Sequence, residues 1–299
     1  MSNFDDIFTA PKTEPEEVSV PPFDKEEWVQ QKRAERVQAF ETIDQMAGLM
    51  TVAGEHVQQY LDLQSRFPRY SVGNILLLSA QKPDATRIGD FKFWKDSGAF
   101  IKQGETGIVI LEPGNEFTKE DGSVGVAYNA KRVFDISQTT EKVPSDPQIH
   151  RDDRLLIKAL IYNAPCEIRI DDTVRFPEGM AARYDPDSHT IYVARNQEGQ
   201  TLFREIAREL AHAHMDHEGY NRDTCEFTAV CVSYMVCKRN NVDVGAFSFT
   251  DLPESFKSLD SRGVRAELGK MRDVANSITA DMDRLYEKQK DAKSRDDAR

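Results

Sequence analysis

Residues 203–217, FREIARELAHAHMDH, contain the residue types of a zinc-peptidase helix at every position but one. Such a helix carries two histidines four residues apart, which bind the metal from one face of the helix. The glutamate after the first histidine takes a proton from the metal-bound water. Glu209 stands at the position of this general base, and His212 stands at the position of the second histidine. Glu226 is placed to supply a third ligand from the next predicted helix, but Arg208 replaces the first histidine.

Arg208 decides which chemistry is open to this helix. A guanidinium keeps its proton in proteins and has no lone pair for a metal ion. The sequence therefore predicts a metallopeptidase-like unit without a cofactor, in which Arg208 donates hydrogen bonds to Glu209, to Glu226 or to both. The alternative is an active zinc peptidase, with Glu209 as general base and with His212, Glu226 and a substitute ligand holding Zn. Whether the unit is an enzyme stays open at this point.

Between Arg66 and Asp135 the sequence combines cations with aromatic residues. This segment has ten Lys or Arg against nine Asp or Glu, whereas the whole chain has a net charge of −12. Proteins that bind single-stranded nucleic acid use cations for the phosphates and aromatic rings for the bases. The alternative for Trp94 is a core position, with only one of Phe93 and Trp94 exposed, and the alternative for Asn74 is a buried hydrogen bond. The residues expected to contact a strand are Arg69, Tyr70, Asn74, Trp94, Lys95, Lys102, Lys131 and Arg132.

Composition limits the class of protein. The chain has 299 residues, of which 39% are hydrophobic and 30% charged, as is typical of globular proteins. The negative net charge argues against non-specific binding of duplex DNA by the chain as a whole. No apolar run approaches the ~20 residues of a membrane helix, and the N-terminus lacks the pattern of a signal peptide. We therefore expect a cytoplasmic protein without a membrane partner, whose four cysteines are thiols without a CxxC pattern.

Periodicity predicts an α+β protein. Residues 1–24 are acidic and rich in proline, which predicts a flexible tail. Residues 25–140 begin with helices, which break near Gly54 and restart after Ser71, and continue into a small antiparallel sheet. Residues 150–260 contain short strands and two core helices, and residues 261–299 form an amphipathic helix with a frayed end. The apolar heptads of that helix indicate packing against its own domain, with a dimeric coiled coil as the alternative.

The first unit contains several spaced motifs: RYSVGNILLLSAQKPDAT, DFKFWKDSG, KQGETG and VFDISQT. With YDPDSHTIYV and RELAHA in the second unit, they make the chain resemble the ArdC-type antirestriction proteins of mobile elements, especially the form of Gram-positive bacteria. Two departures stand out, since Asp90 replaces the usual glycine before FKFW and Arg208 replaces a histidine. The resemblance implies a single-stranded-DNA-binding domain over residues 25–140 and a zincin-like α+β domain over 150–260.

The resemblance also implies a biological role. An ArdC-like protein would protect incoming mobile DNA from host restriction or assist its transfer, so single-stranded DNA is the expected partner. A host restriction enzyme or a peptide substrate is a further candidate partner. An acidic interaction scaffold is a third hypothesis, because the surface carries excess negative charge.

Overall fold

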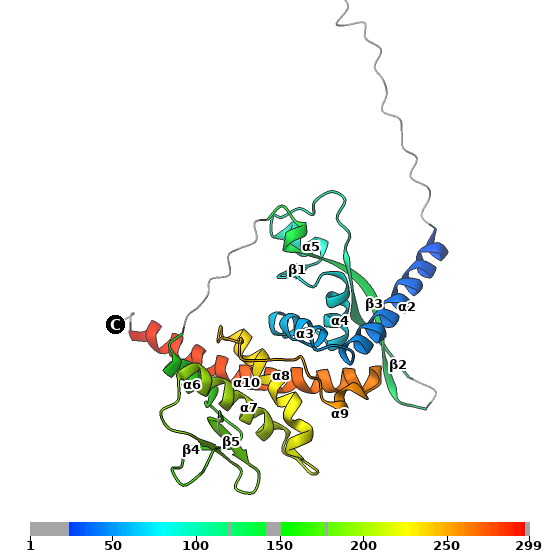
Figure 1. Cartoon of the computed structure of the whole chain (residues 1–299). Coiled ribbons are helices and arrows are strands. Elements are labelled where there is room, and N and C mark those ends of the chain that lie inside the picture. The colour runs from blue at the N-terminus through cyan, green and yellow to red at the C-terminus, as the bar shows by residue number, and fades with distance from the viewer. Residues whose placement is uncertain (1–23, 119–120, 142–150, 177–178, 297–299) are drawn as a thin grey trace, which may run out of the picture.

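The computed structural model describes residues 24–118, 121–141, 151–176 and 179–296. The predicted tail, except Asp24, and most of the predicted boundary at 140–150 lie outside these ranges. The described chain combines helices with two small sheets and is an α+β structure, as the periodicity predicted (Figure 1).

Three helices open the described chain: α2 (Lys25–Met50), α3 (Gly54–Arg66) and α4 (Val72–Gln81). Ser71 caps α4 by accepting a hydrogen bond from the Asn74 amide, as its position before an apolar run predicted. The break before Gly54 is also confirmed. A Cβ atom at residue 54 would overlap the carbonyl oxygen of Phe249, so only glycine lets α3 approach that distant backbone.

A three-stranded antiparallel sheet follows these helices, in the order β1-β3-β2. Its strands are β1 (Ile88–Gly89), β2 (Ile108–Thr118) and β3 (Val124–Asp135), with the short helix α5 (Phe91–Asp96) after β1 and the 3₁₀ turn η1 (Ile136–Gln138) after β3. The strand that begins at Ile108 does not end at Pro113 and Gly114, although these residues often terminate strands. It continues to Thr118 through a register shift between Pro113 and Glu116, because a bulge accommodates a residue without an amide hydrogen.

The second half begins with α6 (Asp153–Leu160) and forms its own sheet in the order β4-β6-β5. β4 (Glu167–Ile170) runs parallel to β6 (Thr190–Val193), and β5 (Ala182–Asp185) pairs with β6 in the antiparallel direction. α7 (Gly199–Met215) packs on β5, and α8 (Arg222–Arg239) packs on α7. The short helix α9 (Glu254–Lys257) follows. Both predicted core helices are confirmed.

The last helix, α10 (Ser261–Asp296), joins the two halves. It contacts α2 and α4 of the first half and α6, α7 and α8 of the second half, so it runs along the centre of the molecule in Figure 1. Its predicted apolar stripe is buried and belongs to one apolar core that extends from Ala39 to Met282. The stripe is therefore covered by this chain itself, over both halves. Within the described ranges, no helix has the length and apolar character needed to cross a bilayer.

Candidate functional site

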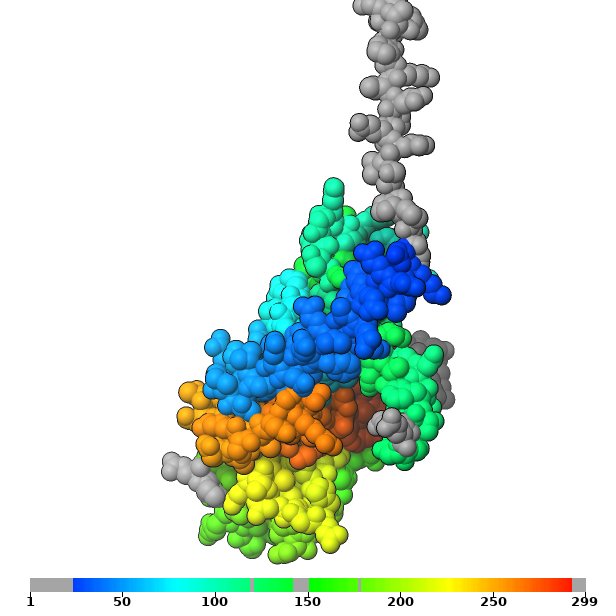
Figure 2. Space-filling view, turned by 90° about the vertical axis from the view of Figure 1, so that its right-hand side faces the viewer, coloured from blue at the N-terminus to red at the C-terminus, as the bar shows by residue number. Residues whose placement is uncertain are grey.

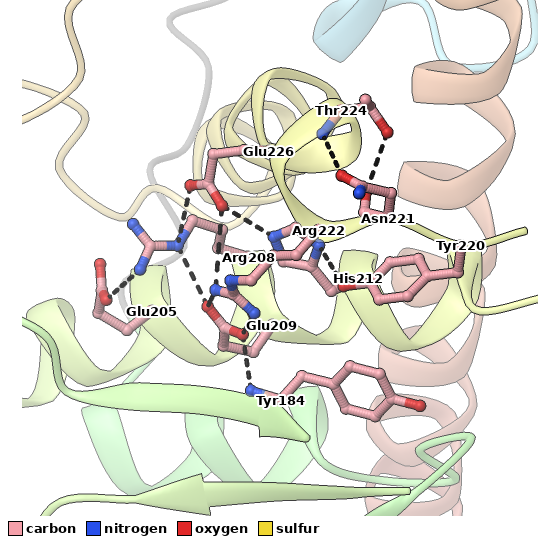
Figure 3. Close-up of polar contacts among 10 residues, drawn as sticks. All are labelled: Tyr184, Glu205, Arg208, Glu209, His212, Tyr220, Asn221, Arg222, Thr224 and Glu226. Carbon is pink, nitrogen blue, oxygen red and sulfur yellow. Dashed lines mark hydrogen bonds and ion pairs between the residues drawn. The ribbon is translucent and has the colours of Figure 1, made fainter. Parts of the chain in front are cut away.

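Glu209 is the centre of a buried polar cluster between α7, α8 and β5 (Figure 3). Its side chain has no exposed surface. One carboxylate oxygen accepts a hydrogen bond from the amide of Tyr184 at 2.7 Å. Arg222 donates from both terminal nitrogens to the two oxygens, at 2.8 and 2.7 Å. This fork-to-fork geometry is the strongest pairing of arginine with a carboxylate, and it compensates the buried charge of Glu209.

Arg208 lies among three carboxylates. Its Nε is 3.3 Å from an oxygen of Glu209 and 3.7 Å from an oxygen of Glu226, and its Nη2 donates to Glu205 at 2.9 Å. Of the two carboxylates that the sequence predicted as acceptors, Glu209 accepts a hydrogen bond and Glu226 forms a longer ion pair. Burial raises the pKa of Glu205, although the charge of Arg208 acts in the opposite direction. Arg208 is thus held by α7 itself and by α8.

His212 is also fully buried, and both of its ring nitrogens are engaged. Nε2 lies 3.0 Å from an oxygen of Glu226, and Nδ1 lies 3.0 Å from the hydroxyl of Tyr220. Burial opposes the ionisation of Glu226, but the hydrogen bond from His212 and the charges of Arg208 and Arg222 outweigh it and hold the pKa of Glu226 below its ordinary value. The cluster therefore favours the ionised form of Glu226.

These residues do not fit a divalent metal ion. A metal held by His212 and Glu226 would sit beside the guanidinium groups of Arg208 and Arg222, which lie within 4 Å of Glu226 and repel a cation. Within the described ranges, no group of three His, Cys, Asp or Glu side chains is arranged to hold a metal. Each oxygen of Glu209 already accepts two hydrogen bonds, one from Arg222 and the other from Tyr184 or Arg208. The arrangement locks α7 to α8 and to β5.

Two members of this cluster, Arg222 and Tyr220, were missed by the sequence analysis. Arg222 stands four residues before Glu226 on α8, so both side chains lie on one face of that helix. This four-residue spacing from Glu226 was the sequence signal by which Arg222 could have been found. Asn221 caps α8 by accepting from the Thr224 amide, which fixes where the helix begins and places Arg222 in its first turn. Tyr220 gave no pattern, because its contact with His212 depends on the path of the connecting loop.

The candidate strand-binding residues of the first half do not form one surface. Lys131 lies between Asp90 at 2.8 Å and Glu112 at 2.7 Å, and hydrogen bonds to these two carboxylates raise its pKa. The same three charges act on the half-buried Tyr70, whose pKa burial raises. Asp90, the departure from the usual glycine, thus caps α5 and neutralises Lys131.

The other candidate cations lie apart from Lys131. Arg132 is the next residue on β3, so it points to the opposite face and pairs with Glu35 of α2 at 2.7 Å. Lys102 donates to the carbonyl oxygen of Ser137 at 2.8 Å. Lys95 and Arg69 are exposed on α5 and on the turn before α4. The structure therefore groups Tyr70 with Lys131 and separates the remaining cations.

Two candidates have their polar groups engaged inside the fold, away from the exposed surface where a strand was expected to contact them. Trp94 is 1% exposed and donates its indole N–H to the carbonyl oxygen of Phe134, whereas the adjacent Phe93 is 40% exposed. Asn74 is buried and binds the backbone of Leu111, accepting at 2.8 Å and donating at 2.9 Å. A buried amide without partners would be costly, so this pairing fixes α4 on β2. The alternative considered for each residue is the one observed.

Comparison with known proteins gives one family match, to the N-terminal domain of anti-restriction factor ArdC over residues 37–145. Among solved structures, the chain is similar to the antirestriction ArdC protein from the R388 plasmid. For the metal-free structure the identity is 18% and the TM-score 0.48, over 72% of this chain and 86% of that chain. For the Mn(II)-bound structure the identity is 16% and the TM-score 0.49, over 71% and 85%. No curated protein matches this chain.

Proposed function

Since residues 37–145 form an ArdC-type N-terminal domain, we propose that this chain binds single-stranded DNA and acts in antirestriction or in DNA transfer. The family match is the observation that carries the proposal. Exposed cations and aromatic side chains of the first half support it, because single strands are bound through phosphates and unstacked bases. Lys95 and Lys102 are exposed, as are Phe91, Phe93 and Phe100 in the same segment.

A binding assay with the full chain tests this part of the proposal. We expect a fluorescein-labelled oligothymidine to bind more tightly than a duplex of equal length, as measured by fluorescence anisotropy. Affinity should fall steeply as salt rises, because cations that contact phosphates displace condensed counterions. An acidic scaffold that mimics DNA would bind neither probe. Equal affinity for both probes, or binding that is insensitive to salt, would contradict single-strand binding.

The second half acts, in this proposal, as a metallopeptidase-like unit without its metal. Arg208 and Arg222 together supply two positive charges to a cluster of three carboxylates, where a divalent cation would supply the same charge. Peptide hydrolysis would require Glu209 to release Arg222 and a metal to displace Arg208. We therefore propose that this half has a structural or a partner-binding role.

Elemental analysis tests the second half directly. We expect far less than one Mn or Zn per chain after purification without chelators, and no change in melting temperature when a chelator is added. Arg208→His is the informative variant, because it restores a histidine four residues before His212. One metal ion per wild-type chain would contradict the proposal and favour the zinc peptidase.

The antirestriction role is tested by the entry of unmodified single-stranded plasmid DNA into a restricting host. This chain should increase that entry.

A further inference from the structure

A groove lies between the N-terminal part of α2 and strand β3. In Figure 2, α2 is blue and lies beside the green β2–β3 hairpin. The groove has a volume of about 470 Å³. Its lining combines aromatic, aliphatic, amide and cationic side chains and contains no acidic residue: Trp28, Val29, Lys32, Arg33, Arg36, Tyr128, Asn129 and Ala130.

Two aromatic rings are accessible in this groove. Trp28 is 47% exposed and Tyr128 is 39% exposed, so each presents ring surface to a ligand. Phe40 of α2 holds Tyr128 in an edge-to-face contact, with ring centroids 6.2 Å apart. Exposed aromatic surface is costly in water, and a stacked base covers it without demanding a particular sequence.

The groove also holds two arginines that no carboxylate of the described residues neutralises. Glu35 is the acidic residue nearest in sequence to Arg33 and Arg36. It pairs instead with Lys32 at 2.8 Å and with Arg132 at 2.7 Å. Arg33 and Arg36 have no carboxylate within 4 Å in the part of the chain that the structure describes. In a chain with a net charge of −12, such a site attracts a polyanion locally while the rest of the surface repels it.

We infer that this groove holds the single strand, with Arg33 and Arg36 on the phosphates and Trp28 and Tyr128 stacked on the bases. The inference rests on the proposed function and assigns its binding site. The α2 side of the groove, residues 28–36, precedes the matched segment 37–145, and only the β3 side lies within it. None of the eight residues selected from the sequence lines the groove.

The surface around α5 is the competing location in the first half. It has exposed phenylalanines and lysines, but its tryptophan is buried and Lys131 is neutralised by two carboxylates. The α2–β3 groove has an exposed tryptophan and two guanidinium groups that are not paired with any carboxylate in the described ranges. Two arginines that are not paired with carboxylates can bind phosphates without first breaking an ion pair. This difference favours the groove.

Three double variants of the full chain distinguish these locations. Each removes two positive charges, so the variants differ only in where the charge is lost. Arg33→Ala with Arg36→Ala changes the groove, and Lys95→Ala with Lys102→Ala changes the α5 surface. Arg175→Ala with Arg183→Ala is the control, because both arginines are exposed in the second half. We expect the groove variant to weaken oligothymidine binding about tenfold and to reduce the salt slope by roughly 1.4, at about 0.7 per lost phosphate contact.

Intrinsic fluorescence gives a second, independent readout. The chain has two tryptophans, Trp28 and Trp94, and Trp94 is buried. A base that stacks on Trp28 should quench its emission, and Trp28→Phe should remove this quenching while Trp94 still emits. Tyr128→Ala should weaken binding by about fivefold or more, the loss of one base–aromatic stack. Unchanged melting temperatures would show that these exposed substitutions leave the fold intact.

The outcomes distinguish the site from the function. If the wild-type chain binds oligothymidine but the groove variant behaves like the control, the groove assignment is overturned while the proposed function stands. A larger loss in the α5 variant overturns it in the same way. If the wild-type chain does not bind, both proposals fail. Equal quenching of Trp28 by a polyglutamate peptide would also overturn the assignment, because the groove would then accept an acidic protein segment.

Discussion

Replacing Arg222 by alanine tests whether the cluster around Glu209 stabilises the fold. The substitution removes both hydrogen bonds of the fork and leaves the carboxylate of Glu209 buried with 0% exposure. Breaking a buried ion pair by removal of one partner costs roughly 3–5 kcal/mol. Two features reduce this cost. Arg222 is 23% exposed, so water enters the vacated space, and Tyr184 and Arg208 still donate to Glu209.

We therefore expect Arg222→Ala to lower the free energy of unfolding by about 2–4 kcal/mol. For a chain of this size that corresponds to a fall in melting temperature of about 4–8 °C. Urea denaturation followed by circular dichroism measures the first quantity, and a thermal scan measures the second. Arg222→Lys should lie between the wild type and the alanine variant, because lysine keeps the charge but loses the two-pronged geometry.

A double-mutant cycle separates the ion pair from general damage. Glu209→Gln removes the buried charge, so adding Arg222→Ala to it should cost much less than Arg222→Ala does in the wild type. Arg175→Ala, an exposed arginine in the same half, serves as the control and should leave stability unchanged. Additive effects of the two substitutions, or a melting temperature of Arg222→Ala equal to that of the wild type, would refute the reasoning.

Three further predictions follow from individual contacts. Asp90→Asn keeps the cap of α5 and leaves Lys131 paired with Glu112 alone. Because Lys131 does not line the groove, the affinity for oligothymidine measured by anisotropy should change less than about twofold, although an exposed ion pair is worth up to about 1 kcal/mol; a clear rise would favour the α5 surface instead. Gly54→Ala should lower the free energy of unfolding by about 1–3 kcal/mol through backbone overlap, whereas Gly48→Ala in open space on α2 should not; urea titrations of both variants compare them directly. Burial holds the pKa of His214 below its ordinary value of 6.5, so as pH falls below about 6.5 the unfolded chain gains a proton that the folded chain resists, and stability declines. His214→Gln should flatten that decline in melting temperature, and an identical pH profile in the variant would argue against this origin.

Much of the fold was predictable because it depends on local signals. Ser71 before an apolar run predicted the start of α4, and the sequence after the helices predicted a small antiparallel sheet. The apolar stripe of α10 was visible as heptads. The continuation of β2 past Pro113 was not predicted, because a bulge depends on what the opposite strand supplies. The division into units stays a prediction, whereas the main apolar core of the described residues extends over both halves, beside a small second cluster around Trp94.

The sequence by itself determined which atoms are available for chemistry. Arg208 has no lone pair in any fold, so the loss of a metal ligand could be inferred without coordinates. Tertiary structure alone decided which side chains meet. It brought Arg222 onto Glu209, placed Trp94 inside and Phe93 outside, and set Arg33 and Arg36 of α2 beside Tyr128 of β3. The physical reason is that residue type fixes charge and hydrogen-bonding capacity, whereas burial and pairing depend on contacts between segments far apart in the chain.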